Sequence, residues 1–346
     1  MVDVLEQFTG AATLQRSRLD WLPEAVLRPH EPATAAVQPS VAVLIPCCNE
    51  EATIAKVVAD FHASLPRATI YVYDNNSCDR TITRARAAGA VVRSELLQGK
   101  GHVVRRMFAD IDAEAFILVD GDDTYDAGAA PAMLRLLRER QLDMVNAARM
   151  TEGADAYRLG HRLGNRLLSG MVQAVFGSRI SDVLSGYRAF SRRFVKSFPA
   201  LAGGFETETE FTVHALELKM PIAEVATRYR VRPNGSKSKL RTWSDGLRIT
   251  RTILLLVKES RPLQFFATVG SLLLLAALAL GAPVVLAFLH TGQVPRLPSA
   301  VLATGLVLLS SLTLVCGMVL DSVERGRKEM KRLAYLAIPP APPADG

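Results

Sequence analysis

The chain has 346 residues, more than a single typical domain needs, so we expect one large domain with an appended segment. Its formal net charge of +7 suits anionic partners such as phosphates or an acidic membrane face, although a merely soluble basic surface would give the same balance. Its four cysteines form no C-x-x-C pair and have no histidine at metal-ligand spacing, which argues against a zinc site and a disulfide framework.

Residues 1–39 show no clear periodicity and are interpreted as an N-terminal extension. No signal peptide is expected, because the first residues lack a basic segment followed by an apolar one. After them, strand patterns alternate with helical patterns in an order that predicts βαβ units and a parallel, doubly wound sheet. The domain built in this way is expected to span residues 40–240. The strand patterns lie at 41–46, 69–74, 90–95 and 115–120, and the helical patterns lie at 49–65, 79–90 and 100–111.

Polar residues follow three of these strand patterns, at Pro46–Glu51, Asp74–Asp79 and Asp120–Asp123. Ligands of doubly wound sheets bind at the carboxyl ends of the strands. We therefore expect the three segments to line one crevice.

The third segment belongs to an acidic stretch, "VDGDDTYD", in which Asp120 and Asp122 form a D-x-D. Mg²⁺ and Mn²⁺ prefer oxygen ligands, and Mg²⁺ commonly takes one or two carboxylates together with substrate phosphates. A solvated acidic turn is the alternative, but the position after a strand favours a metal site. Asp123 and Asp126 are expected to support this site or to form the turn behind it.

No P-loop motif occurs in the sequence, and no G-x-G-x-x-G follows the first strand pattern. The stretch "QGKGH" at 98–102 places Lys100 between two glycines before a helical pattern. It could hold a phosphate or simply turn the chain, and both interpretations stay open.

Two segments near the C-terminus, 264–289 and 300–320, carry no charge and are each long enough to cross a hydrocarbon layer of roughly 30 Å. They predict a transmembrane hairpin within 263–320, against the alternative of two buried helices in a soluble core. Basic residues flank the hairpin, in the amphipathic stretch 241–262 and in the tail 321–346, whereas the connecting loop carries only Arg296. The positive-inside rule then puts the large domain and both termini on the cytoplasmic side of the cell (inner) membrane. The stretch 241–262 is expected to lie at the membrane interface as a helix, although packing on the soluble domain fits its pattern equally well.

Five motifs occur in order: "VLIPCCNEE", "YDNNSCDRT", "VDGDDTYD", "DVLSGYRAF" and "RPNGSKSK". Together, over about residues 40–240, they resemble family 2 glycosyltransferases, and within them the polyprenyl-phosphate glycosyltransferases of the dolichol-phosphate mannosyltransferase type. The resemblance implies a GT-A fold, an α/β architecture with a Rossmann-like, mostly parallel sheet, here followed by a C-terminal two-helix transmembrane hairpin.

The resemblance also implies roles for individual residues, and we carry these over motif by motif. Asp120 and Asp122 would bind Mg²⁺ or Mn²⁺ on the diphosphate, and Asp122, Asp182 and Arg188 would form the catalytic set. The residues that would bind the nucleotide are Pro46, Asn49, Glu51, Asp74, Asn76, Asp79, Lys100, Asp120 and Gly121. The residues that would bind the acceptor phosphate are Ser185, Arg188, Arg232, Ser236 and Lys237.

The implied reaction is the inverting transfer of a single sugar from a UDP- or GDP-linked donor to a polyprenyl phosphate. A divalent ion would stabilise the charge that develops on the leaving diphosphate. The acceptor phosphate is largely a dianion at neutral pH, so we expect a cationic cradle rather than a strong general base. The candidates for this cradle are Arg188, Arg232, Lys237 and Lys239. Glu206 and Glu208 could be a base, a supporting partner or part of a helix surface.

Two rival functions are a processive polysaccharide synthase and a non-catalytic nucleotide-binding scaffold. The chain lacks the Q-x-x-R-W motif and the additional spans of the synthases, and its intact D-x-D with a later basic motif argues against the scaffold. Nucleic-acid binding is not expected, because the basic residues cluster beside the predicted membrane spans. The expected partners are a nucleotide sugar, a polyprenyl phosphate, the membrane and a separate flippase, in a pathway of cell-envelope glycan synthesis. Assembly into a homo-oligomer stays open.

Overall fold

The computed structural model describes residues 40–150, 169–170, 173, 180–201, 203–204, 206–230, 258 and 261–340. The expected N-terminal extension and most of the amphipathic stretch predicted at 241–262 lie outside these residues. So do four predicted acceptor-binding or cradle residues, Arg232, Ser236, Lys237 and Lys239.

Seven strands form one sheet in the described part of the chain, in the order β3-β2-β1-β4-β6-β5-β7. The pairs β1–β2, β1–β4, β2–β3 and β5–β7 are parallel, and β6 runs antiparallel to both β4 and β5. The mostly parallel α/β sheet expected from the sequence is therefore confirmed. The strands are β1 (Val41–Cys47), β2 (Thr69–Asp74), β3 (Val91–Ser94), β4 (Ala115–Leu118), β5 (Met144–Met150), β6 (Arg188–Ser191) and β7 (Ile222–Arg228).

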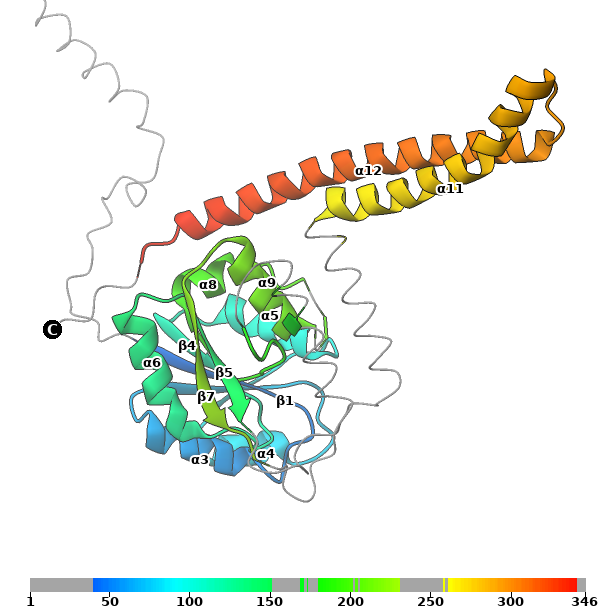
Figure 1. The fold of residues 1–346 in the computed structure, drawn as a ribbon. Coiled ribbons are helices and arrows are strands. Elements are labelled where there is room, and N and C mark those ends of the chain that lie inside the picture. Colours follow the sequence, from blue (N-terminus) through cyan, green and yellow to red (C-terminus); the bar gives the residue numbers. More distant parts are fainter. Residues whose placement is uncertain are drawn as a thin grey trace, which may run out of the picture. The chain divides into compact units, whose positions relative to one another are not determined.

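Helices cover both faces of the sheet (Figure 1). Strand β1 shows why both faces are apolar: Val43 and Ile45 enter one hydrophobic core, whereas Ala42 and Leu44 enter the other. The first core is closed by α3 (Ile54–Ser64), α4 (Thr81–Ala87) and α6 (Ala130–Glu139), and the second by α5 (Lys100–Asp110), α8 (Arg192–Ser197) and α9 (Thr207–Glu217). A single 3-10 turn, η2 (Ala127–Ala129), precedes α6.

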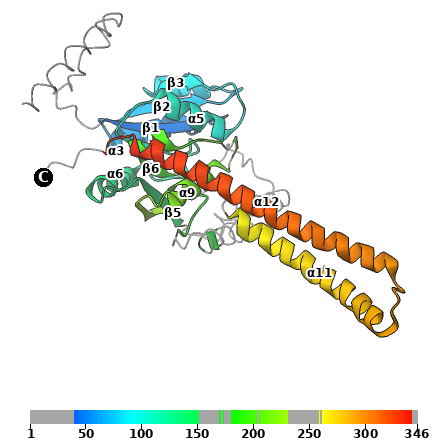
Figure 2. The ribbon, with the colours of Figure 1, turned by 90° about the horizontal axis from the view of Figure 1, so that it is seen from above.

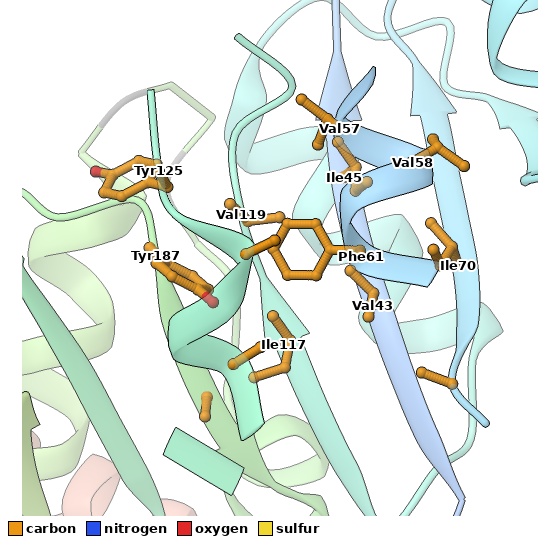
Figure 3. Close-up of a cluster of buried hydrophobic side chains, with 14 of the residues drawn as sticks. Val43, Ile45, Val57, Val58, Phe61, Ile70, Ile117, Val119, Tyr125 and Tyr187 are labelled. Carbon is orange, nitrogen blue, oxygen red and sulfur yellow. The ribbon is translucent and has the colours of Figure 1, made fainter. Parts of the chain in front are cut away.

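Phe61 occupies the middle of the first core (Figure 3). It is 1% exposed, and its ring meets the ring of Tyr187 edge to face, with centroids 6.1 Å apart. Tyr187 belongs to the loop that precedes β6, so this contact joins the first half of the domain to the segment that carries the "DVLSGYRAF" motif. The packing thereby fixes that motif against the sheet.

Strands β2, β1 and β4 are parallel neighbours, so their carboxyl ends meet at one edge of the sheet. The segments that follow them are the three polar segments singled out in the sequence. A hydrogen bond links the first two of these segments, because the backbone N–H of Glu51 donates to Asp79 over 3.2 Å. Thr53, two residues past the first segment, donates its hydroxyl to the carbonyl of Gly121 in the third over 2.7 Å.

In the described part of the chain, two helices are long and apolar enough to cross a membrane, α11 (Pro262–Thr291) and α12 (Leu297–Leu336). They lie side by side in both views (Figures 1 and 2). Their most apolar stretches are only 11% and 17% buried, so they are not the core helices of a soluble protein.

The contact between these two helices follows a seven-residue repeat. On α12 the buried positions are Ala303, Ser310, Gly317 and Glu324, and on α11 they include Gly270, Ala277 and Val284. The hydroxyl of Ser310 donates to the carbonyl of Gly270 over 2.8 Å. Small residues and an interhelical hydroxyl bond are the means by which helices associate in lipid.

Helix α12 continues well beyond the apolar stretch predicted at 300–320 and contacts the α/β domain. Lys331 pairs with Glu217 of α9 over 2.9 Å, and the hydroxyl of Tyr335 donates to Asp143 over 2.9 Å. The guanidinium of Arg193 lies 5.1 Å from the centre of the Tyr335 ring. Much of the expected basic tail 321–346 is thus a helix that packs on the domain.

Candidate active site

The loops that follow β1 and β2 are joined by hydrogen bonds from the residues predicted to bind the nucleotide. Asn49 donates its backbone N–H to the hydroxyl of Ser77 over 2.8 Å, and its side-chain oxygen accepts the backbone N–H of Cys78 over 2.8 Å. Asn49 and Asn76 both have positive φ, 55° and 61°, a conformation that asparagine tolerates better than most residues. Asn49 therefore shapes these loops.

Glu51 and Asp79 also connect the loops that follow β1 and β2. The backbone N–H of Glu51 donates to Asp79 over 3.2 Å, and the Glu51 carboxylate accepts the backbone N–H of Arg80 over 3.0 Å. This bond to the Arg80 backbone holds the pKa of Glu51 below its usual range. Both carboxylates hold the loops together in this structure.

Asn76 and its neighbour Asn75 connect this junction to the loop after β3. Asn76 donates to the carbonyl of Leu96 over 2.9 Å, and Asn75 donates to the carbonyl of Leu97 over 2.8 Å. The side-chain oxygen of Asn75 accepts the backbone N–H of Gly99 over 2.8 Å, directly before Lys100. Sequence reasoning did not assign a role to Asn75, although its place after a strand would have suggested one.

Asp74 differs from its neighbours because one of its oxygens has no partner in the part of the chain that the structure describes. The side chain is buried, and Oδ2 accepts the backbone N–H of Ser77 over 3.1 Å. Among the described residues Oδ1 meets no donor, although it is fully buried. Buried polar atoms of this kind are rare, and each one calls for an explanation such as a ligand.

Pro46 and Gly121 contribute backbone rather than functional side chains. The pairing of β1 with β4 ends at Leu44, two residues before Pro46. A proline has no backbone N–H to donate, and at this position its absence does not interrupt that pairing. A Cβ on Gly121 would lie 2.6 Å from Sγ of Cys47, so only glycine fits at that position. Burial raises the pKa of the Cys47 thiol well above its usual value, so this cysteine is a packing residue.

The carboxylates of the acidic stretch divide into two kinds. Asp122 is buried, and its Oδ1 accepts both the N–H and the hydroxyl of Thr124, over 3.2 and 2.6 Å. Asp123 has φ of 58° and pairs with Lys56 over 2.7 Å, and Asp126 accepts the N–H of Gly128 at the start of η2. Asp123 and Asp126 therefore form the turn.

Lys100 lies between two carboxylates at the same edge. Its Nζ is 2.5 Å from Oδ1 of Asp120 and 2.6 Å from Oε1 of Glu208 on α9. Burial alone would lower the pKa of Lys100, but the two carboxylates outweigh it and raise the pKa above its ordinary value. Lys100 stays charged, and in this structure it neutralises the acidic edge.

Gly186 closes the site behind Asp120. A Cβ at this glycine would overlap Oδ2 of Asp120 and would lie 3.1 Å from Nζ of Lys100. The backbone N–H of Gly186 donates to the hydroxyl of Tyr125 over 2.9 Å. The "SGY" turn is thus fixed against the acidic stretch, a relation that the sequence motifs did not reveal.

A divalent ion at Asp120 and Asp122 fits the chemistry of the donor set. Both residues follow β4, and both offer the hard oxygen ligands that Mg²⁺ and Mn²⁺ prefer. Among the described residues, no group of three or more His, Cys, Asp or Glu side chains could hold a metal ion. Mg²⁺ commonly takes one or two carboxylates and fills its remaining positions with substrate phosphates and water, so two carboxylates are a fitting protein contribution.

Two residues predicted to bind the acceptor phosphate, Arg188 and Ser185, lie in the core in this structure. The Arg188 side chain is fully buried and donates to the carbonyls of Val183 and Ser185, over 2.7 and 3.0 Å, and to Thr212. Ser185 is also fully buried and donates to the carbonyl of Ala147 over 2.6 Å. In this structure both side chains hold the 182–188 loop through these hydrogen bonds, and their contact with the acceptor stays a prediction.

Asp182, expected in the catalytic set, forms a bidentate ion pair with Arg149. Nε and Nη2 of Arg149 lie 2.7 Å from the two carboxylate oxygens. Arg149 also lies over the ring of Tyr229, with 5.4 Å between guanidinium carbon and ring centroid. Sequence reasoning missed this arginine, although it stands near the end of β5.

Of the two glutamates left open in the sequence, Glu208 lies inside the site and Glu206 lies at its margin. Glu206 is the residue before α9, and it is partly exposed. Glu208 is 4% exposed, and its second oxygen, Oε2, has no partner among the described residues.

The sheet order and the carboxylate edge define a GT-A-like fold, and solved structures share it. The glucosyl-3-phosphoglycerate synthase of Mycobacterium tuberculosis, in complex with Mn²⁺, UDP-glucose and phosphoglyceric acid, matches with a TM-score of 0.52. The match covers 64% of this chain and 80% of that protein, at 24% sequence identity. It supports the fold.

Sequence comparison identifies the family. The model of glycosyl transferase family 2 matches residues 42–198. The glycosyltransferase AglJ of Haloferax volcanii is 33% identical over 304 residues, which cover 86% of this chain and 98% of AglJ. A dolichyl-phosphate hexose transferase of the same organism is 28% identical, over 64% of this chain and 95% of that protein. The chain belongs to glycosyl transferase family 2 and is a glycosyltransferase.

Proposed function

We propose that this enzyme transfers a single sugar from a nucleotide-diphosphate sugar to a polyprenyl phosphate at the cytoplasmic face of a membrane. The observation that carries the proposal is the meeting of Asp74, Asp120 and Asp122 at the carboxyl edge of β2 and β4. Asp74 offers a buried oxygen that has no partner among the described residues, and the other two offer carboxylates suited to a metal ion. A nucleotide and a metal-bound diphosphate require both kinds of group.

The roles of the donor-binding residues follow from this arrangement. Oδ1 of Asp74 would accept an N–H of the base, since it has no other partner among the described residues. Asp120 and Asp122 would hold the divalent ion, which supplies a Lewis acid for the leaving diphosphate. The related fold of the mycobacterial synthase, which was solved with Mn²⁺ and UDP-glucose, supports a divalent ion and a nucleotide sugar.

A lipid acceptor is supported by the apolar hairpin and by the dolichyl-phosphate hexose transferase among the relatives. If α11 and α12 span the membrane, Lys331 and Tyr335 at the far end of α12 link the domain directly to the spanning helix. The phosphate of a membrane-embedded acceptor would then be presented close to the domain. The basic residues Arg232, Lys237 and Lys239, outside the described part, remain our candidates for the phosphate cradle.

We propose a cytoplasmic orientation from the basic flanks of the hairpin. Lys258 and Arg261 precede it, and the basic residues of α12 beyond residue 320 follow it.

The proposal is tested by incubating the full chain in detergent with a panel of radiolabelled UDP- and GDP-sugars and a short polyprenyl phosphate. We expect label in the organic extract for one donor, and loss of that label with EDTA. Nucleotide binding without transfer to any polyprenyl phosphate would favour a non-catalytic scaffold. Labelled products of many sugars would favour a processive synthase.

The stereochemistry is tested on the same product. Attack by a phosphate oxygen on the anomeric carbon, from the face opposite the diphosphate, breaks the bond to the diphosphate and inverts the centre. NMR of the lipid-linked sugar should therefore show the anomeric configuration opposite to that of the donor. A retained configuration would contradict direct displacement.

A further inference from the structure

The two carboxylates that share the Lys100 ammonium differ in their surroundings. The Asp120 side chain keeps 29% of its surface exposed, whereas that of Glu208 keeps 6%. Asp120 is therefore accessible to an incoming ion, and Glu208 lies in the interior on the other side of the ammonium. Lys100 itself is 9% exposed, so its charge is costly unless a carboxylate stays beside it.

The two oxygens of the Glu208 carboxylate differ in their contacts. Oε1 lies 2.6 Å from Nζ of Lys100, whereas Oε2 is buried and has no partner among the described residues. A buried oxygen without a hydrogen-bond donor is unfavourable. The Glu208 carboxylate could therefore accept a second hydrogen bond from the Lys100 ammonium, through Oε2.

A metal ion and Lys100 compete for the same atom. Oδ1 of Asp120 already accepts from the ammonium, and a divalent ion on Asp120 would face a positive charge at close range. The main chain before Lys100 is closely packed, because the position of Gly99, whose φ is 136°, leaves no room for a Cβ beside the carbonyl of Gly203. The long lysine side chain is therefore the group that can move most easily away from a bound ion.

We propose that Glu208 is a positioning residue that takes over the Lys100 ammonium when a divalent ion binds Asp120. Lys100 holds Asp120 in place before the ion arrives, and the carboxylate of Glu208, with its second oxygen, then keeps the lysine neutralised. This inference rests on the proposed metal-dependent function of the same site. It assigns Glu208 to the exchange of counterions rather than to contact with the reacting atoms.

The test is Mn²⁺ binding to the full chain in detergent, measured from the EPR signal of unbound Mn²⁺, alone and with UDP or GDP. Among the described residues, Glu208→Gln leaves Lys100 with Asp120 as its one paired carboxylate, so we expect Mn²⁺ to bind about tenfold more weakly. Lys100→Met removes the competing cation and should bind Mn²⁺ more tightly than wild type. In the double variant Lys100→Met/Glu208→Gln, binding should recover to within about threefold of wild type.

Each outcome decides the matter. Weak binding in the double variant as well would show that Glu208 is a direct metal ligand, and unchanged binding in Glu208→Gln would show that it takes no part. Either result overturns the proposal. If Glu208→Gln fails to fold, Lys100→Met alone decides, because Mn²⁺ binding no tighter than wild type contradicts the competition.

The control Glu139→Gln removes one exposed carboxylate at the end of α6, at the opposite edge of the sheet, and should bind Mn²⁺ as wild type does. Failure of this proposal is distinguishable from failure of the proposed function. Mn²⁺ binding that follows the expected pattern without any sugar transfer would overturn the function alone. Transfer that requires a metal, with Glu208→Gln binding Mn²⁺ as wild type, would overturn the counterion exchange alone.

Discussion

Gly186 and the Asp120 carboxylate are packed so closely that no side chain fits between them, because a Cβ at Gly186 would overlap Oδ2 of Asp120. The Gly186→Ala variant must move the carboxylate, its partner Lys100 or the turn itself. A displacement of about 1 Å in a catalytic group can lower a rate about a hundredfold. We expect a loss of that order in sugar transfer, measured as label in the lipid extract.

The matched control for this variant is Gly326→Ala. Gly326 lies in α12 with no atom within 4 Å of the position of its Cβ, so the same substitution should leave transfer unchanged. Full activity in Gly186→Ala would show that the Asp120 carboxylate tolerates displacement and would remove it from the site.

Arg188 is expected to act through stability rather than through acceptor binding. Arg188→Met leaves the carbonyls of Val183 and Ser185 without donors, so we expect the free energy of unfolding to fall by about 3 kcal/mol. Denaturant unfolding of the full chain, followed by circular dichroism, measures this loss.

The control is Arg192→Met, which breaks the exposed ion pair with Asp112 and should cost less than about 1 kcal/mol. If Arg188→Met instead unfolds like wild type and raises the KM for the lipid acceptor, the arginine contacts the acceptor phosphate. That result would restore the role implied by the family resemblance.

We predict that the free energy of unfolding falls in mild acid because of the buried His214. Burial, with a smaller contribution from Lys331, lowers its pKa from 6.5 to about 3. As the pH falls below 6.5, the unfolded chain binds this proton before the folded chain does, so stability is full above that pH and declines below it. As the pH falls from 6.5 towards 5, the loss from this histidine steepens towards about 1.4 kcal/mol per pH unit.

The measurement is the free energy of unfolding of wild type and His214→Gln across that window. Wild type should lose stability more steeply than the variant as the pH falls. Parallel curves would show that His214 is protonated equally in both states.

We predict that breaking the contact between α12 and the catalytic domain lowers stability modestly and exposes the end of α12. Tyr335→Phe removes the hydrogen bond to Asp143 and keeps the ring beside Arg193, so we expect a loss of about 1 kcal/mol. Tyr335→Ala removes both contacts and should increase protease cleavage after α12. Cleavage equal to wild type in Tyr335→Ala would contradict a docked helix.

Much of the fold follows from local pattern. Continuous apolar runs such as Val41–Ile45 predict central strands buried on both faces, and the alternation of Val43 with Leu44 between the two cores explains why they are continuous. The hairpin follows from length and lack of charge. The antiparallel insertion of β6 between β4 and β5 could not be predicted, since strand pairing depends on contacts between distant segments.

In the candidate site, the sequence motifs predict which residues matter but not which partners their side chains contact. The motif containing Arg188 indicates that the residue matters, but it does not tell whether the guanidinium faces a substrate or the interior. The partners of Lys100 lie 20 and 108 residues away, so their meeting is a property of the folded chain. The charge of the acidic stretch nevertheless pointed to a cation, and the structure contains one in Lys100.

Asp122 and Asp123 provide the most direct test of the central claim, that a divalent ion held by Asp120 and Asp122 enables sugar transfer to a lipid phosphate. Asn is nearly isosteric with Asp and tolerates the positive φ of residue 123, so both substitutions preserve the turn. The measurement is label transferred from the active nucleotide sugar to polyprenyl phosphate, at a series of Mn²⁺ concentrations. We predict that Asp122→Asn loses transfer by about a thousandfold at every concentration, whereas Asp123→Asn stays within about threefold of wild type. Equal activities in the two variants, or transfer that persists in EDTA, would contradict the claim.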